Sequence, residues 1–101
     1  MTLCKNEQIA ELFRIQLVAE QLKTFIDESE QIHLFFSHLE GFTGIEILIL
    51  SETDLLVLIR WKSYQLFEKY LPMILNAEIV KTWLKPTYLI SHQPAILKST
   101  A

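Results

Sequence analysis

Five side chains suited to chemistry lie at defined places in the sequence: Arg14, Gln16, His33, Trp61 and Tyr70. Arg14 and Gln16 share a face of an alternating segment, and His33 lies within an apolar helical stripe. Trp61 ends an apolar run, and Tyr70 borders a second stripe. An arginine can stabilise an anionic oxygen, a histidine can take up a proton near neutral pH, and aromatic rings can flank a flat ligand. His33 and Arg14 are therefore the catalytic candidates, and Trp61, Tyr70 and Gln16 the substrate-binding candidates.

Each candidate also has a purely structural alternative. A lone histidine in an apolar stripe is more often a core residue bonded to a backbone carbonyl than a base. Arg14 could form a buried pair with an acid such as Glu46, or lie at a dimer interface. Trp61 could fill the core, and Tyr70 could be a surface aromatic. We expect the other histidines to be solvated: His38 and His92.

Composition excludes several classes of protein. The chain has 101 residues, 50% of them hydrophobic, with 2 Gly and 3 Pro, which excludes a disordered or fibrous chain and allows one core. With 9 basic against 12 acidic residues, it lacks a basic stripe for phosphates, so we expect no nucleic-acid partner. No apolar run approaches the roughly 18 residues of a membrane span. We therefore expect a soluble, cytoplasmic protein.

Metal and cofactor motifs are absent from the sequence. Cys4 is the single cysteine, so an internal disulfide and a CxxC site are excluded. The histidines at 33, 38 and 92 form no i, i+4 pair, and there is no Gly-rich phosphate loop or GxSxG elbow. We expect no metal and no cofactor.

The hydrophobic pattern predicts six elements. Residues 12–18 alternate as a strand, and apolar residues at three- and four-residue steps predict a helix over 21–38. Two apolar runs, 45–50 and 55–61, flank the polar connection 51–54 and predict a β-hairpin.

A second helix and a last strand follow the predicted hairpin. Ser63 is a suitable N-cap for a helix beginning at Tyr64. Pro72 predicts that this helix ends or kinks there, with a second helical piece reaching Trp83. Residues 87–92 predict a last strand, limited by Pro94.

The order β-α-β-β-α-β is that of an α+β, ferredoxin-like split βαβ sandwich, with a four-stranded antiparallel sheet and helices on one face. We expect a flexible segment over 1–10, a single domain over 11–97 and a tail over 98–101.

The run 55–61 also predicts a partner. Leu55, Val57 and Ile59 lie on one face of that strand, and Leu56 and Leu58 on the other. Two helices shield only one face of a sheet, so the other would leave an exposed apolar patch. We expect a homodimer through the sheet faces; the alternative is a terminal segment that covers this face.

Three segments together resemble the antibiotic biosynthesis monooxygenase superfamily: LEGFTGIE over 39–46, RWKS over 60–63 and YQLF over 64–67. The family typically has a Gly-Phe-x-Gly turn after its first helix and a Trp-x-Ser junction between its third strand and second helix. The resemblance covers roughly 13–92. It implies the dimeric α+β barrel, in which two ferredoxin-like protomers join their sheets.

The resemblance also implies a function. Members oxidise polycyclic phenols with dioxygen and no metal or flavin, others degrade haem, and many have no established substrate. The haem-degrading branch uses an asparagine, a tryptophan and a histidine at positions that fall here near Arg14, at Tyr70 and at Val80, and none matches. The resemblance therefore favours a cofactor-independent monooxygenase acting on an aromatic or polycyclic phenol. From the phases of their strand and helix, we expect Trp61 and His33 to face one cavity. The alternative is a non-catalytic ligand-binding or structural barrel with a filled cavity.

Overall fold

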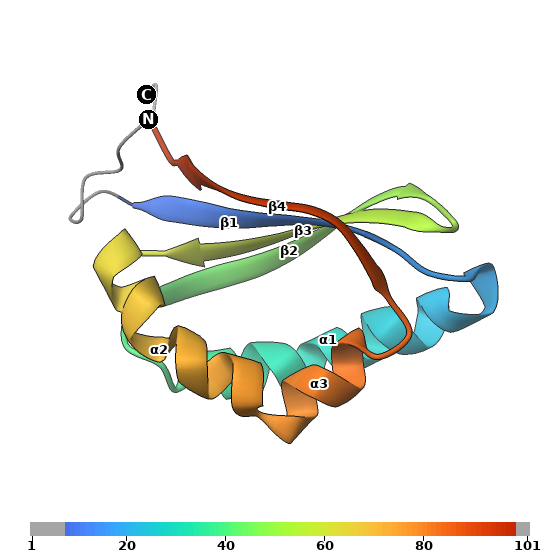
Figure 1. Cartoon of the computed structure of the whole chain (residues 1–101), viewed down its shortest axis with the longest axis horizontal. Helices are drawn as coiled ribbons and strands as arrows, with labels where there is room; N and C mark the ends of the chain where they lie inside the picture. Colours follow the sequence, from blue (N-terminus) through green and yellow to red (C-terminus); the bar gives the residue numbers. More distant parts are fainter. Residues whose placement is uncertain (1–7, 99–101) are drawn as a thin grey trace.

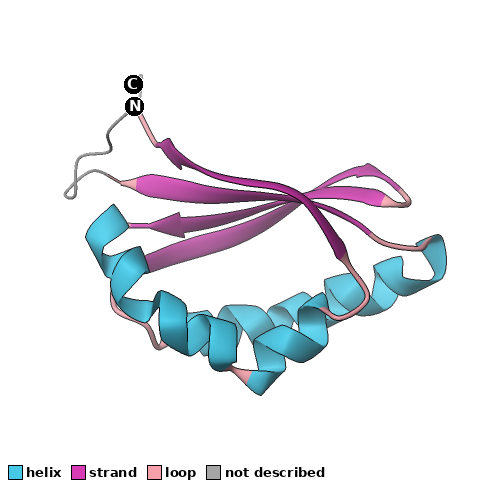
Figure 2. Cartoon of the chain, in the orientation of Figure 1, coloured by secondary structure: helices cyan, strands magenta, loops and turns pink. Residues whose placement is uncertain are grey.

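The computed structural model describes residues 8–98; the predicted terminal segments, up to residue 7 and from residue 99, lie outside the described residues. A four-stranded antiparallel sheet in the order β2-β3-β1-β4 is covered on one face by helices (Figures 1 and 2). This is the predicted ferredoxin-like α+β architecture. The elements are β1 (Ile9–Gln16), a 3-10 turn η1 (Ala19–Gln21), α1 (Leu22–Ser37), β2 (Phe42–Ser51), β3 (Asp54–Trp61), α2 (Tyr64–Asn76), α3 (Glu78–Leu84) and β4 (Tyr88–Ile96).

The core lies between the helices and the central strands β1 and β3. Every second residue of β3 is buried, from Leu55 to Trp61, as expected for a strand with one face against helices. Ile9 and Ile15 of β1 lie on the same face, and Phe25 and Ile32 of α1 are also buried in this core. The helix-facing side of the sheet is therefore the apolar surface on which a site would be built.

The predicted second helical piece reaching Trp83 is present as α3, but helix α2 ends at Asn76 and not at Pro72. Helix α2 continues through Pro72 to Asn76, and the chain turns at Ala77, whose backbone is extended (φ −75°, ψ 126°). Pro72 is exposed, so the Glu68 carbonyl that loses its helical donor lies on the solvent side of the helix. The predicted N-cap is confirmed, since the Leu66 N–H donates to Ser63 Oγ at 3.2 Å.

Strand β1 begins earlier and strand β4 ends later than predicted, and these two extensions lie side by side in the sheet. Ile9 and Ala10, assigned from the sequence to the N-terminal segment, are buried in β1. Strand β4 continues through Pro94, which lies opposite Glu11, because an edge strand tolerates a residue without an N–H. The extension of β1 brings Glu11 into the sheet, beside His92 of β4.

Gly41 and Gly44, the two glycines of the segment that resembles the family, have different roles. Gly41 has φ +92°, and a Cβ there would lie 2.5 Å from Leu66 Cδ1. Gly44 lies under the Arg60 guanidinium, where a Cβ would lie 2.4 Å from Nη2. Gly41 thus sets the backbone between α1 and β2, whereas Gly44 makes room for a side chain.

The face of the sheet away from the helices carries a leucine patch, defined here as Leu12, Leu48, Leu56 and Leu58. Register places Leu12 opposite Leu58 and Leu48 opposite Leu56, so the four leucines adjoin one another across three strands. Leu48 is 46% exposed, and the other three are half-buried.

Within the described residues, no helix is long and apolar enough to span a membrane.

Candidate active site on the helix-facing side of the sheet

An aromatic cluster surrounds Trp61, the last residue of β3. Its ring is 1% exposed and contacts Phe36, Phe42 and Phe67 with centroids 6.2, 5.9 and 5.8 Å away. Tyr70 of α2 stacks on it at 6.4 Å and 20° between planes. The structure thus brings together the two rings predicted to flank a substrate.

The indole N–H of Trp61 has no partner among the described residues. A buried donor without an acceptor costs free energy, on the order of 1–3 kcal/mol. An oxygen atom of a bound molecule could accept from this N–H, and this is the polar feature of the aromatic cluster.

His33 does not share a cavity with Trp61. It is exposed on α1, with its ring edge-on to Phe42 at 5.6 Å, and Phe42 in turn packs against Trp61. His33 lines a surface hollow of about 370 Å³ that Trp61 does not reach, together with Ser29, Glu30, Gln31, Leu34 and Ile45. The expectation of one shared cavity is not met, and the assignment of His33 as a base stays a prediction.

Arg14 and Gln16 lie on the face of the sheet away from the helices. The Arg14 guanidinium donates to both Asp54 carboxylate oxygens, at 2.6 and 3.3 Å, and this hydrogen-bonded pair raises the pKa of Arg14 above its ordinary value. Glu46, the acid expected for Arg14, instead pairs with Arg60 at 3.0 Å. Neither Arg14 nor Gln16 lines the space between the sheet and the helices.

A carboxylate–imidazole pair that the sequence analysis missed lies on the helix-facing side. Glu11 is 1% exposed, and its Oε2 contacts Nε2 of His92. His92 lies opposite Phe13 in the β1–β4 register, and the rings stack at 4.4 Å and 3° between planes. The second carboxylate oxygen, Glu11 Oε1, is buried without a partner among the described residues.

One feature of the sequence could have predicted that Glu11 is buried. Glu11 continues the alternation of Phe13 and Ile15, so a strand begun one residue earlier than predicted would have placed it on the buried face. Burial raises the pKa of Glu11, and the hydrogen bond and charge of His92 act in the opposite direction. His92, expected to be solvated, is 37% exposed through its side chain and paired.

The side of this pair toward β4 is open to solvent. Leu89, which lies opposite Ile15 in the register and so shares the face of Phe13 and His92, is 60% exposed. In Figure 1 the helices lie beneath the sheet, and β4 is its edge strand. Glu11 is therefore the buried end of the pair, and His92 is the end that a molecule from solvent can reach.

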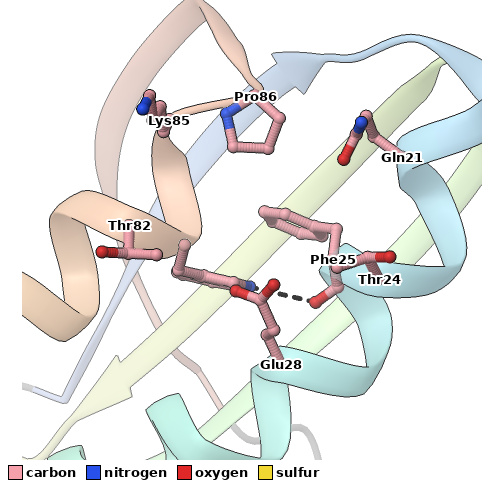
Figure 3. A pocket seen from close by; sticks show the side chains of 8 residues that line it. Gln21, Thr24, Phe25, Glu28, Thr82, Lys85 and Pro86 are labelled. Atoms are coloured by element: carbon pink, nitrogen blue, oxygen red, sulfur yellow. Dashed lines mark hydrogen bonds between the residues drawn. The ribbon is translucent and has the colours of Figure 1, made fainter.

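A second hollow lies between α1 and α3 (Figure 3). Trp83 stacks on Phe25 at 4.6 Å, and its indole N–H donates to the Phe25 carbonyl at 3.0 Å. The hollow has a volume of about 410 Å³ and is open at the surface; it is lined by Gln21, Thr24, Phe25, Glu28, Thr82, Trp83, Lys85 and Pro86. It holds none of the residues predicted for the site. Among the described residues, no group of three or more His, Cys, Asp or Glu could hold a metal ion.

Comparison with known proteins places the fold. No family model matches the sequence, and no curated protein matches it. Among solved structures, a point mutant of SnoaB from Streptomyces nogalater, a cofactor-independent oxygenase, is similar at TM-score 0.76 and 12% identity, over 93% of this chain and 96% of that one. A putative antibiotic biosynthesis monooxygenase from Nitrosomonas europaea is similar at TM-score 0.66 and 10% identity, over 98% and 96%.

A conserved protein from Methanosarcina mazei Go1 is similar at TM-score 0.66 and 14% identity, over 95% of this chain and 96% of that one. The chain therefore has the fold of the antibiotic biosynthesis monooxygenases, as its motifs predicted. At these identities the likeness establishes the fold alone.

Proposed function

We propose that the protein is an oxidoreductase that oxidises an electron-rich aromatic phenol with dioxygen, without a metal or an organic cofactor. The observation that carries the proposal is the buried Trp61 indole N–H without an acceptor among the described residues, at the centre of an aromatic cluster. Stacked rings bind a flat aromatic molecule, and an N–H directed at its oxygen stabilises the anion that forms when the phenol loses its proton. The fold shared with a cofactor-independent oxygenase supports the same reading.

In this reaction the protein mainly binds the substrate and removes its proton. An electron-rich phenolate can pass an electron to dioxygen directly, giving a ring-centred radical and superoxide. Their recombination forms a C–O bond, and loss of water from the protonated peroxide takes a hydrogen from the same carbon and leaves one oxygen atom on the ring. The site must therefore bind the phenol, take its proton and keep the anion in apolar surroundings. Opening of the contact between Tyr70 and Trp61 would admit the ring, because Tyr70 is half-buried and lies on a helix at the edge of the cluster. His33 and Arg14 stay predictions for the catalytic roles.

We also propose that the protein acts as a homodimer joined through the leucine patch. The patch lies on the face of the sheet that no described helix covers, and ion pairs lie beside it, Arg14 with Asp54 and Arg60 with Glu46. A second copy of the same face would bury the leucines and leave the charged pairs toward the rim.

One observation favours a second function. Trp61 is 1% exposed and covered by four rings, and neither hollow described above includes it. A core filled by its own side chains is what a structural or ligand-binding barrel without catalysis would have.

Oxygen uptake separates these two functions. The purified, metal-free protein would be tested with anthrone- and naphthol-type phenols beside two variants, Trp61→Phe and Trp83→Phe. Trp83 is the matched control, since it is equally buried but its N–H is already bonded to the Phe25 carbonyl. Uptake that falls at least tenfold in Trp61→Phe and persists in Trp83→Phe supports the proposed oxidation of the phenol. Uptake equal to that without protein favours the non-catalytic barrel.

A further inference from the structure

We propose that His92, oriented by Glu11, is the base that takes the proton of the phenol. The inference rests on the proposed function and adds to it the group that ionises the substrate. Glu11 and His92 are diagonal neighbours on β1 and β4. They share the helix-facing side of the sheet with Trp61 but lie further along it, since Trp61 is opposite Ile9 and His92 is opposite Phe13. The phenol O–H ionised here is therefore at the β4 edge, and the Trp61 N–H would donate to a different part of the bound molecule.

The contact between the two side chains fixes which imidazole nitrogen is free. When Glu11 is ionised, both of its oxygens are acceptors, so Nε2 of His92, which faces Glu11 Oε2, then carries the hydrogen. Nδ1 then holds the lone pair and can accept a proton. Stacking on Phe13 at 4.4 Å holds the ring in plane, so the free nitrogen keeps one direction.

The same contact supplies the charge that the reaction needs. When the phenol O–H bond breaks, its proton joins Nδ1 and its electron pair stays on the phenolate oxygen, giving an imidazolium beside a phenolate. The Glu11 carboxylate, 1% exposed, stabilises that imidazolium across the Nε2–H bond. Its other oxygen, Oε1, is buried and without a partner among the described residues, so no other described side chain neutralises the carboxylate there.

A substrate can reach this nitrogen from solvent. His92 is 37% exposed through its side chain, and Leu89 beside it on the same face is 60% exposed. Phe13, His92 and Leu89 together form an apolar and aromatic surface that suits the edge of a flat phenol. Glu11 is a positioning residue, since it touches only the imidazole.

Ionisation of a bound phenol can be measured without oxidation. The probe is 4-nitrophenol, whose phenol and phenolate forms absorb at different wavelengths, at a pH below its own pKa in solution. Saturating wild-type protein should raise the phenolate fraction of the bound probe at least twofold over the free probe. His92→Gln and Glu11→Gln should return that fraction to the free value while equilibrium dialysis still detects binding. His38→Gln, at an exposed histidine that follows α1, should match the wild type.

A second readout tests the positioning role of Glu11. In protein labelled with ¹⁵N in histidine, neutral His92 should be the Nε2–H tautomer in the wild type, and Glu11→Gln should lower the population of that tautomer. Circular dichroism would establish that each variant is folded.

Several results would overturn the inference: no binding of 4-nitrophenol, an unchanged phenolate fraction in the wild type, a fraction unaffected by His92→Gln, or loss of ionisation in His33→Gln instead. Ionisation without oxygen uptake from the phenol panel would contradict the proposed oxidation and support His92. Oxygen uptake that survives His92→Gln would overturn this inference and leave the proposed function standing.

Discussion

Glu11 and His92 contact each other across β1 and β4 although 81 residues separate them in the chain. The contact joins the first and last strands of the described fold, and it places a titratable pair on a face that is otherwise apolar and aromatic. A buried carboxylate is costly unless it is paired, so this pair is either a functional feature or a burden on stability, and both readings can be measured.

The pH dependence of stability should reveal the burial of Glu11. Its pKa is raised in the folded protein above its ordinary value of about 4.5, so the folded state holds this proton more tightly than the unfolded chain. The contribution is therefore complete below that ordinary value and is lost as the pH rises through the raised folded pKa. Glu11→Gln, which cannot ionise, should gain stability relative to the wild type as the pH rises from acid to neutral. Urea denaturation across that range measures the difference, and a difference that is flat or falls with pH contradicts it.

The two tryptophans should respond differently to truncation. Trp83→Phe removes a buried hydrogen bond to the Phe25 carbonyl, whereas Trp61→Phe removes an N–H that has no partner among the described residues. We expect Trp83→Phe to lower the free energy of unfolding by about 1 kcal/mol more than Trp61→Phe. Chemical denaturation of both variants checks this. A larger loss in Trp61→Phe would mean that its ring packing outweighs the missing bond.

Pro72→Ala should stabilise the protein. Pro72 is exposed inside α2, and alanine would restore an N–H for the Glu68 carbonyl. Alanine is favoured over proline inside a helix by about 3 kcal/mol. Alanine also gives the unfolded chain more conformational freedom, which lowers this gain in stability by up to about 1 kcal/mol. We expect a gain of about 2 kcal/mol in the free energy of unfolding. Met73→Ala, at the next exposed position, should change it by only a few tenths. An unchanged or lower stability in Pro72→Ala would contradict the prediction.

The two glycines offer a matched pair. Gly41→Ala forces a side chain into φ +92° and against Leu66, so we expect a loss of at least about 1–2 kcal/mol. Gly44→Ala meets only the end of the flexible Arg60 side chain, which can move, so its loss should be smaller. Thermal unfolding of both variants ranks them, and equal losses would argue against the role given to the backbone at Gly41.

The homodimer predicts a mass. Light scattering at micromolar concentration should give about twice the chain mass of 11.8 kDa. Leu48→Lys, which places a charge on the leucine patch at a position that is already 46% exposed, should give the monomer mass and stay folded. Leu34→Lys, on an exposed position of α1, should stay dimeric. A wild-type mass near that of one chain would rule out the interface.

The fold could be predicted because its signals are local. Alternating apolar residues in β3, the stripe of α1 and the Ser63 cap depend on neighbours in sequence, and the structure keeps them. Pro72 misled the prediction of α2, because a single exposed carbonyl can lose its donor without ending a helix that packs through Phe67 and Ile74. Packing outweighed the local rule.

The site could be predicted only in part. Trp61 and Tyr70 come together because one ends β3 and the other lies on the helix that follows it. The link between Glu11 and His92 depends on the β1–β4 register, which a single sequence does not reveal, and the start of β1 was placed too late to include Glu11. The contacts of Phe42 with His33 and with Trp61 likewise depend on tertiary packing, which the sequence pattern does not reveal.

The most direct test of the proposed oxidation follows the oxygen atom. The protein would be incubated under ¹⁸O₂ with the most active anthrone- or naphthol-type phenol, and the product analysed by mass spectrometry beside a sample without protein. The account predicts one ¹⁸O atom in the product, formed faster with wild-type protein and Trp83→Phe than with Trp61→Phe. A product without ¹⁸O, or one formed at the same rate without protein, would contradict it.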